Sequence, residues 1–414
     1  MANLPNQDIV IETTSSAKQN YTIALIVLAV LYLMMGFITC LNDTLVPFFK
    51  AGFVLNYTQS SLVQFYFFLT YGIMSIPAGK IVEKIGYKNG MVTGFGVAAF
   101  GAILFYPASI WHQYNLFLMA LFVLAIGIVL LQVAANPYIT ALGPPATASS
   151  RLTLIQGIGS IGTTVAPVFG AYYILSGLQS AHSSSESVRI PYLIIAGTLI
   201  LIAFIVSRLT LPQIKLGIKI SGNVDDLTKS IFSFRNFNYG LAALFLYVGA
   251  EVAVGSFLTN YIADVLVIKG AVANTYVSLY WGGMLIGRLL GAVVLRKVKP
   301  ATVLIISALI AIGLIMVSIS QTGSLAMWTI VSVGLCNSIM FAVIFSLSVN
   351  GLGRFTPQAS GLLSTAIVGG AVVSSLMGLI KDSYSWRVAF ILPLLCYGYI
   401  TLFGIIASKR TINQ

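Results

Sequence analysis

Runs of about 20 consecutive apolar residues recur along the whole chain, and each is long enough to cross the hydrocarbon core of a bilayer as a helix. Of the 414 residues, 58% are hydrophobic and 8% are charged, whereas about 25% of the residues in a soluble domain are charged. The strands of a membrane barrel would alternate apolar and polar residues, and these runs are continuous. The sequence therefore predicts an all-α membrane protein.

Twelve such runs are present, and the longest polar interruption divides them into two groups of six. The predicted transmembrane helices are 22–46, 60–82, 89–110, 115–141, 150–176, 190–210, 237–262, 272–295, 301–320, 325–349, 358–380 and 386–408. The predicted organisation is an N-terminal tail at 1–21, a six-helix bundle at 22–210, a linker at 211–236, a second six-helix bundle at 237–408 and a C-terminal tail at 409–414.

The net charge of +12 is distributed unevenly between the two ends of the predicted helices. Sixteen of the 22 lysines and arginines fall on the side that holds both termini, five fall on the other side, and Arg288 lies within a span. Lysine and arginine concentrate in the cytoplasmic segments of membrane proteins. We therefore expect a multi-pass protein of the cell (inner) membrane with both termini and the linker in the cytoplasm, and we expect no nucleic-acid partner.

The chain lacks the patterns from which disulfide frameworks, metal sites or catalytic centres are usually built. Cys40, Cys336 and Cys396 lie in apolar runs, while His112 and His182 lie in short polar breaks. This distribution predicts neither a disulfide nor a metal site. No histidine lies within a span and no nucleophile motif is found, so we expect no enzyme activity and no cofactor.

Two carboxylates, Asp43 and Glu251, lie well inside long apolar stretches. A charged side chain at the centre of a membrane helix costs roughly 2.5–3.5 kcal/mol on insertion scales, so such residues usually face a cavity or an ion pathway. Each acid lies in the opening helix of one half, which indicates ion coupling. Two structural alternatives stay open, namely a neutral hydrogen-bonded Asp43 and an ion pair between Glu251 and Arg288.

The two halves show a weak internal repeat. At an offset of 208 residues Asp43 falls on Glu251, and at an offset of 210 residues Ser150 falls on Ser360. Together with the six-plus-six layout, these matches predict two parallel repeats with a substrate bound between them near mid-membrane.

A loop motif lies between the second and third predicted helices. It begins at Gly79, contains Glu83 and Lys84, and ends at Lys88; the second half keeps the corresponding Arg288 but has no acid there. The motif resembles the loop of major facilitator transporters. We interpret Gly79, Glu83, Lys84 and Arg288 as a cytoplasmic gate, in which Glu83 pairs with a basic group or a helix N-terminus. The alternative is an ordinary positively charged loop.

Five amide side chains are predicted to lie at membrane depth. They are Asn42, Gln132, Asn136, Gln156 and Asn337. Unsatisfied amides are costly in an apolar environment, so each binds either a substrate or another side chain. A sugar presents many hydroxyl groups that both donate and accept hydrogen bonds, which predicts a sugar-binding role for these five. The alternative for any one of them is a hydrogen bond that holds two helices together.

Several segments are similar to the fucose:proton symporter family of major facilitator transporters, which includes bacterial glucose/galactose transporters. They lie at 36–43, 62–68, 74–79, 131–138, 142–144, 150–156, 247–252, 255–258 and 337–341. The resemblance covers nearly the whole chain and implies a major facilitator fold. Fucose-type members have a glutamate, assigned to proton coupling, where this chain has Gln132. Members that resemble glucose/galactose transporters carry the glutamine together with a glutamate like Glu251, and some relatives of that branch are linked to sodium.

We therefore predict secondary active import of a hexose, most simply glucose or galactose, by symport with H⁺ or Na⁺ and alternating access. Asp43 and Glu251 are the predicted ion-coupling residues. The alternatives are a symporter of fucose or another sugar and an exporter of a sugar or a drug. We expect a monomer whose partners are the lipid bilayer and a small sugar.

Overall fold

The computed structural model describes residues 21–53, 57–175, 186–212, 230–267 and 270–412. This part of the chain consists of helices, turns and short connections. The first half contains α1 (Thr22–Gly52), α2 (Tyr57–Ile103), α3 (Phe105–Ile110), α4 (Tyr114–Ala141), α5 (Ala148–Gly170) and α6 (Arg189–Arg208). The second half contains α7 (Arg235–Leu266), α8 (Gly270–Val294), α9 (Pro300–Ser320), α10 (Gly323–Asn337), α11 (Met340–Val349), α12 (Thr356–Thr365), α13 (Gly369–Ser383), α14 (Trp386–Ala389) and α15 (Ile391–Ile412).

Eleven stretches of the described residues are long and apolar enough to span a membrane. One of them, Phe65–Ile110, has 46 residues, about twice what one span requires. It is interrupted at Gly86, whose φ of 80° and ψ of 164° are not helical. Glycine adopts this conformation without the steric cost that a Cβ would bring. The stretch therefore counts as two spans, and the predicted all-α fold with twelve transmembrane helices is confirmed.

Several helix boundaries differ from those predicted. Helix α1 continues to Gly52 and α7 to Leu266, well beyond the predicted ends. The span predicted at 325–349 is broken between α10 and α11, and the one predicted at 358–380 contains a 3₁₀ turn at Ala366–Val368 between α12 and α13. Hydropathy locates the membrane core, and it does not report where a helix continues past that core or breaks inside it.

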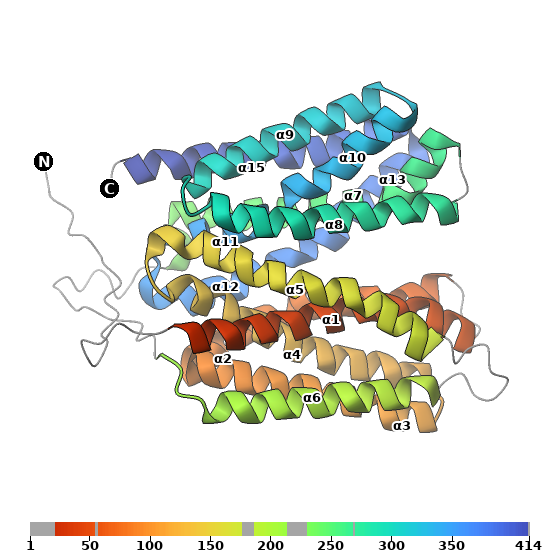
Figure 1. Ribbon diagram of the computed structural model, residues 1–414, viewed down its shortest axis with the longest axis vertical. Helices are drawn as coiled ribbons and strands as arrows, with labels where there is room; N and C mark the ends of the chain where they lie inside the picture. Colours follow the sequence, from red (N-terminus) through yellow and green to blue (C-terminus); the bar gives the residue numbers. More distant parts are fainter. Residues whose placement is uncertain (1–20, 54–56, 176–185, 213–229, 268–269, 413–414) are drawn as a thin grey trace, which may run out of the picture.

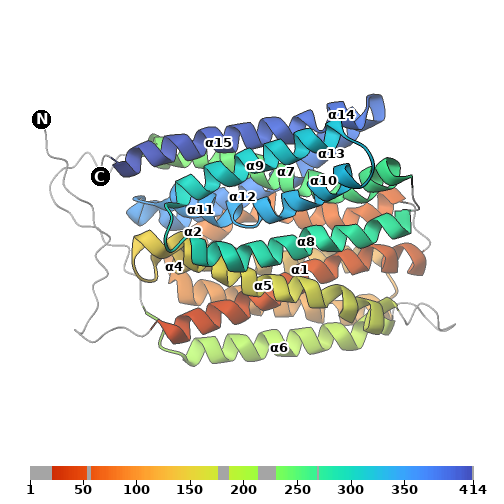
Figure 2. The ribbon, with the colours of Figure 1, turned by 45° about the horizontal axis from the view of Figure 1, so that its top comes forward.

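The helices form two groups, α1–α6 and α7–α15, which meet along α5 and α8 and along α2 and α12 (Figures 1 and 2). The first turn of α1 and the last turn of α15 lie at the same end of the molecule, on the left in Figure 1. Of the predicted linker at 211–236 the structure describes 211–212 and 230–236, and of the predicted tails at 1–21 and 409–414 it describes 21 and 409–412. We call the end at which α1 begins the terminal end.

The two groups are closest at the terminal end, and α5 and α8 diverge towards the opposite end (Figure 1). Hydrogen bonds join the groups near the terminal end. The Ser150 hydroxyl of α5 donates to the Ala292 carbonyl of α8 at 2.5 Å, and the Ser360 hydroxyl of α12 donates to the Val133 carbonyl of α4 at 2.9 Å. The molecule is therefore closed at its terminal end.

The carbonyl that Ser360 reaches is free because of a proline. Proline has no N–H, so Pro137 in α4 leaves the carbonyl four residues earlier, that of Val133, without its helical partner. A carbonyl left unpaired in an apolar interior is costly. The Ser360 hydroxyl supplies the missing hydrogen bond from the other half of the molecule. A local sequence feature thus creates a contact point between the halves.

Helices α1 and α5 approach each other through glycines. A Cβ atom on Gly162 would collide with the Leu33 carbonyl, and one on Gly36 would collide with the Gly159 carbonyl. Small residues let membrane helices pack at short distance, where van der Waals contact replaces the hydrophobic effect. This packing fixes α1 against α5 and so positions the polar residues that both helices carry.

Candidate substrate and ion site

A buried tyrosine connects three helices of the first half. The Tyr32 hydroxyl of α1 donates a hydrogen bond to the Asn136 side-chain oxygen of α4, and Gln156 of α5 hydrogen-bonds to the same hydroxyl. Tyr32 is 4% exposed and Asn136 is fully buried. A tyrosine hydroxyl has one proton to donate and can also accept. Tyr32 therefore sets the orientation of both amide groups.

Four amides of the first half keep one buried polar atom each without a partner among the described residues. The unpaired atoms are Asn42 Oδ1, Gln132 Oε1, Asn136 Nδ2 and Gln156 Oε1. A buried polar group without a hydrogen bond costs about 1–3 kcal/mol. Such atoms are rare in native proteins and mark places where water, an ion or a ligand binds. The set offers one donor and three acceptors, which suits a molecule with several hydroxyl groups.

Three of these amides lie together and one lies apart. Gln132 is one helical turn from Asn136 on the same face of α4, and Tyr32 brings Gln156 beside Asn136. Asn42 stands further along α1, about 15 Å from Tyr32 at 1.5 Å per residue. We call Tyr32, Gln132, Asn136 and Gln156 the amide cluster. Asn42 lies outside this cluster, towards the end opposite the terminal end.

Asn337 is surrounded differently. Its side-chain nitrogen donates to the Tyr280 hydroxyl at 2.9 Å, and its side-chain oxygen accepts from the Tyr397 hydroxyl at 2.8 Å. Asn337 and both tyrosines are fully buried. Both ends of this amide are therefore bonded to protein, as expected for a group that holds α8, α10 and α15 together. That Asn337 contacts a sugar stays a prediction.

The break between α10 and α11 lies at the same depth. It exposes backbone carbonyls, which must find other partners inside a membrane. The Tyr247 hydroxyl of α7 donates to the Asn337 carbonyl at 2.9 Å, and Arg288 of α8 donates to the Ser338 carbonyl at 3.3 Å. Side chains from two neighbouring helices thus stabilise the interruption.

Arg288 reaches from one half of the molecule to the other. Its guanidinium also donates to the Ser160 hydroxyl of α5. It lies close enough to interact electrostatically with Glu251 and with Tyr32 of the amide cluster. Within the described residues the one ion pair joins Arg189 to Glu186 at 3.1 Å, so Arg288 and Glu251 do not form one. Arg288 therefore stands between the acid and the amides.

The two predicted ion-coupling acids are described to different extents. Glu251 lies on α7, partly buried, where its carboxyl group is within hydrogen-bonding reach of Tyr247. The Tyr280 hydroxyl donates to the Glu251 backbone carbonyl at 3.3 Å, which ties this part of α7 to α8. Asp43 lies on α1 beside Asn42, but its side chain is outside the described part of the structure. Its role stays a prediction.

The predicted gate residues occupy two depths. A Cβ atom on Gly79 would lie 3.1 Å from the Pro357 carbonyl oxygen and 3.3 Å from the Gly361 Cα, so Gly79 lets α2 touch α12 across the halves. Glu83 and Lys84 are exposed on α2 and make no ion pair with another described residue. Arg288 lies deeper, against α5. The gate assignment stays a prediction, and Gly79 and Arg288 are the members that contact the opposite half.

Sequence reasoning missed four tyrosines and one serine that hold these groups in place. Tyr32, Tyr247, Tyr280, Tyr397 and Ser160 each bond to a predicted site residue. A tyrosine far from the membrane interfaces needs a partner for its hydroxyl. This requirement could have marked the buried tyrosines as hydrogen-bonding residues, but it does not identify the partner of each hydroxyl.

The comparison with known protein families agrees with this architecture. The family described as Major Facilitator Superfamily matches residues 25–375. The chain therefore belongs to the Major Facilitator Superfamily, a family of multi-pass membrane transporters, and it is not an enzyme.

Particular relatives narrow the family further. The chain is 46% identical to a glucose/galactose transporter of Brucella abortus, over 96% of this chain and 97% of the relative. It is 32% identical to the L-fucose-proton symporter of Escherichia coli, over 97% of each chain. A crystal structure of the transporter FucP in the outward conformation matches with a TM-score of 0.85 and 31% identity, covering 94% of this chain and 99% of that one. The family resemblance seen in the sequence is thus confirmed.

Removing two of the serine contacts between the halves, those of Ser150 and Ser360, should favour opening of the terminal end. Each buried hydrogen bond contributes about 1 kcal/mol, so Ser150→Ala with Ser360→Ala should shift the equilibrium between closed and open forms roughly 30-fold if the two effects add. Spin labels at Lys84→Cys and Lys299→Cys, in a background without the native cysteines, would report a longer distance. Ser207→Ala removes a hydroxyl that bonds within α6 and should leave the distance unchanged.

Replacing Asn337 should damage stability. Asn337→Leu leaves the buried hydroxyls of Tyr280 and Tyr397 without their amide partner, at about 1–3 kcal/mol each. We expect a clear fall in the thermal unfolding midpoint of the detergent-solubilised protein. Tyr397→Phe removes one hydroxyl and should cost less. An unchanged midpoint for Asn337→Leu would mean that this network does not hold the helices together.

Proposed function

We propose that the protein imports a hexose by secondary active symport, with glucose or galactose as the substrate and H⁺ or Na⁺ as the coupling ion. The observation that carries the proposal is the amide cluster, in which Gln132, Asn136 and Gln156 each keep a buried polar atom unpaired. A sugar hydroxyl can donate to an amide oxygen and accept from an amide nitrogen at once. Drug exporters prefer broad apolar cavities, which this set does not resemble.

The choice of sugar rests on the relatives and on one position. The relatives named glucose/galactose transporter are more similar to this chain than the one named L-fucose-proton symporter. Gln132 agrees with this choice. Fucose-type members have a proton-coupling glutamate at this position, whereas the Gln132 amide binds hydroxyl groups but cannot take up a proton. Asn42, at the end opposite the terminal end, is a further proposed sugar contact. Asn337 belongs to the proposed set only if a sugar displaces Tyr280 or Tyr397 from its amide.

The ion-coupling role falls to Asp43 and Glu251. Both are acids within membrane-spanning helices, where ionisable residues mark ion pathways and substrate sites. Glu251 lies close to Arg288, and Arg288 bonds to Ser160 of the other half. A change in the charge of Glu251 would therefore alter the electrostatic potential at the contact between Arg288 and Ser160, which joins the halves. This arrangement couples ion binding to the movement that opens and closes the site.

The proposed setting is the cell (inner) membrane with both termini in the cytoplasm, so that the terminal end is the cytoplasmic end. The uneven distribution of lysine and arginine supports this orientation. A molecule closed at its cytoplasmic end is ready to take up substrate from outside. We propose a monomer as the working unit, since each half supplies its own part of the site within one chain.

Uptake into proteoliposomes tests the proposal. Labelled glucose would be supplied with an imposed proton gradient or an imposed sodium gradient, and unlabelled galactose, mannose and fucose would compete. We expect accumulation with one of the two gradients and strong competition by galactose. Competition by fucose alone would favour a fucose symporter. An absence of uptake and exchange of every hexose would overturn the sugar assignment.

A further inference from the structure

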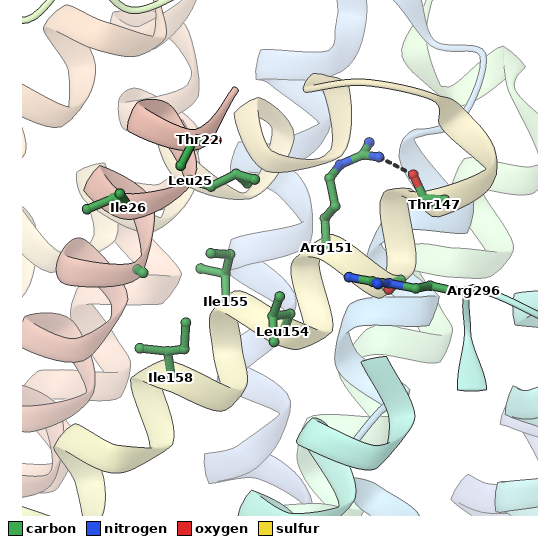
Figure 3. Close-up of a pocket in the computed structure, with 11 residues that line it drawn as sticks. Thr22, Leu25, Ile26, Thr147, Arg151, Leu154, Ile155, Ile158 and Arg296 are labelled. Carbon is green, nitrogen blue, oxygen red and sulfur yellow. Dashed lines mark hydrogen bonds between the residues drawn. The ribbon is translucent and has the colours of Figure 1, made fainter. Parts of the chain in front are cut away.

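A pocket of about 610 Å³ lies at the terminal end, between α1, α5 and the residues that follow α8 (Figure 3). Its polar rim comes from Thr22, Thr147, Ser150, Arg151 and Arg296, and its wall comes from Leu25, Ile26, Leu154, Ile155 and Ile158. The pocket does not include any member of the amide cluster. It is therefore a separate site.

The rim of this pocket carries positive charge that no described carboxylate neutralises. Arg151 donates to the carbonyls of Thr140 and Pro144 at 2.9 and 3.0 Å, and it also bonds to the Ile139 carbonyl and the Thr147 hydroxyl. All four acceptors are neutral. Arg296 is exposed and forms no ion pair with a described residue. Arg151 and Arg296 thus line one pocket without an anion from the described chain, and Arg151 keeps one of its five N–H donors unused.

Part of the apolar wall lies at the outer surface of the helices, where it can face lipid, while Ile155 is buried. Ile26 is 58% exposed on α1, and Ile161, one turn beyond the pocket on α5, is 45% exposed. Figure 3 shows Leu25 and Ile26 on one side of the pocket and Leu154, Ile155 and Ile158 on the other, with Arg151 and Arg296 at one end. An occupant with a charged head and an apolar chain would match both parts.

The position along the membrane agrees with such an occupant. Thr22 is the first residue of α1, and Arg296 follows the last residue of α8, so both lie where spanning helices reach the lipid headgroups. Basic pockets between transmembrane helices at this depth bind anionic headgroups. We propose that this pocket binds an anionic phospholipid, with its phosphate at Arg151 and Arg296 and its acyl chain along α1 and α5.

The lipid would join the two halves of the molecule. Arg151 belongs to the first half and Arg296 to the second, so one phosphate between them attracts both. Two guanidinium groups with no anion between them repel each other. An anionic lipid therefore stabilises the form that is closed at the terminal end, the same end at which Ser150 and Ser360 join the halves.

Lipid retention on the purified full chain tests this site. Native mass spectrometry would follow binding of phosphatidylglycerol and of phosphatidylcholine with identical acyl chains. Arg296→Gln should weaken phosphatidylglycerol binding roughly fivefold, as expected for one basic residue at a lipid surface. Lys297→Gln removes the same charge from an exposed neighbour outside the pocket and should change little. If the two substitutions weakened phosphatidylglycerol binding equally, the lipid would be attracted by general surface charge, and the proposed site would be wrong.

A second pair of variants tests the apolar wall without changing charge. Ile26→Trp fills the pocket and should lower phosphatidylglycerol retention, whereas Ile23→Trp lies on an exposed part of α1 outside it and should not.

Competition with inorganic phosphate distinguishes a lipid site from a simple anion site. The proposal would be overturned if millimolar phosphate displaced bound phosphatidylglycerol as effectively as added lipid does. It would also be overturned if the unmodified chain retained phosphatidylglycerol and phosphatidylcholine equally.

Discussion

Asn136→Ala should weaken glucose binding roughly 10- to 100-fold. The substitution removes the Asn136 nitrogen, which is the one fully buried donor without a partner among the four amides, and it leaves the Tyr32 hydroxyl without its acceptor. Loss of a substrate hydrogen bond and stranding of a buried hydroxyl together amount to about 1–3 kcal/mol. Exchange of labelled glucose across proteoliposomes, measured over a range of concentrations, would give the change in apparent affinity.

Two other variants make this result specific. Tyr32→Phe keeps the Asn136 amide and removes only the hydroxyl that orients it, so a smaller loss of affinity is expected. Asn89→Ala removes an exposed amide that bonds to the Ile85 carbonyl within α2, and transport should be unchanged. If Asn136→Ala binds glucose as tightly as the unmodified protein, the amide cluster is a structural network and the sugar site lies elsewhere.

The amide cluster shows which parts of a site can be predicted from sequence. Gln132 and Asn136 were predicted to share a face of one helix, because their spacing of four residues fixes it. Burial of both follows from the apolar run around them. Their partner Tyr32 lies 104 positions from Asn136 along the chain, on α1. That contact depends on how two helices are rotated about their axes, which their composition does not determine.

Asn337 shows what cannot be predicted from the sequence. In the sequence it is a polar residue within an apolar run, just as Gln132 is, and the same reasoning assigned both to the sugar. In the structure Asn337 has protein partners on both ends of its amide, while Gln132 keeps an unpaired oxygen. A substrate ligand and a structural brace have the same local pattern. What separates them is the count of hydrogen bonds, which requires the neighbouring helices to be in place.

The helices themselves were easier to predict, because a bilayer imposes a length on every span. The break at Gly86 also falls inside the predicted loop motif, although the structure keeps helical conformation close on both sides of it. The interruption between α10 and α11 could not be predicted from hydropathy. It depends on Tyr247 and Arg288, side chains from other helices that satisfy the exposed carbonyls.

Asp43→Asn should abolish accumulation of sugar against a gradient while leaving exchange of sugar intact. An asparagine has nearly the shape of an aspartate but cannot take up a proton and carries no charge for a cation. A transporter without its coupling group still moves sugar between its two faces, and it does so only until the concentrations inside and outside are equal. Labelled glucose in proteoliposomes, with and without an imposed ion gradient, would separate accumulation from exchange.

The same measurement on Glu251→Gln distinguishes the two acids. Glu251 lies beside Tyr247 and close enough to Arg288 to interact with its charge. Arg288 in turn bonds to Ser160 of the other half. If Glu251 acts through this contact, its replacement should slow exchange as well as accumulation, because the movement between open and closed forms is affected. Asp43 is a structural residue if Asp43→Asn still concentrates glucose normally. In that case coupling would fall to Glu251 alone, and Glu251→Gln should then be the variant that equilibrates glucose without concentrating it.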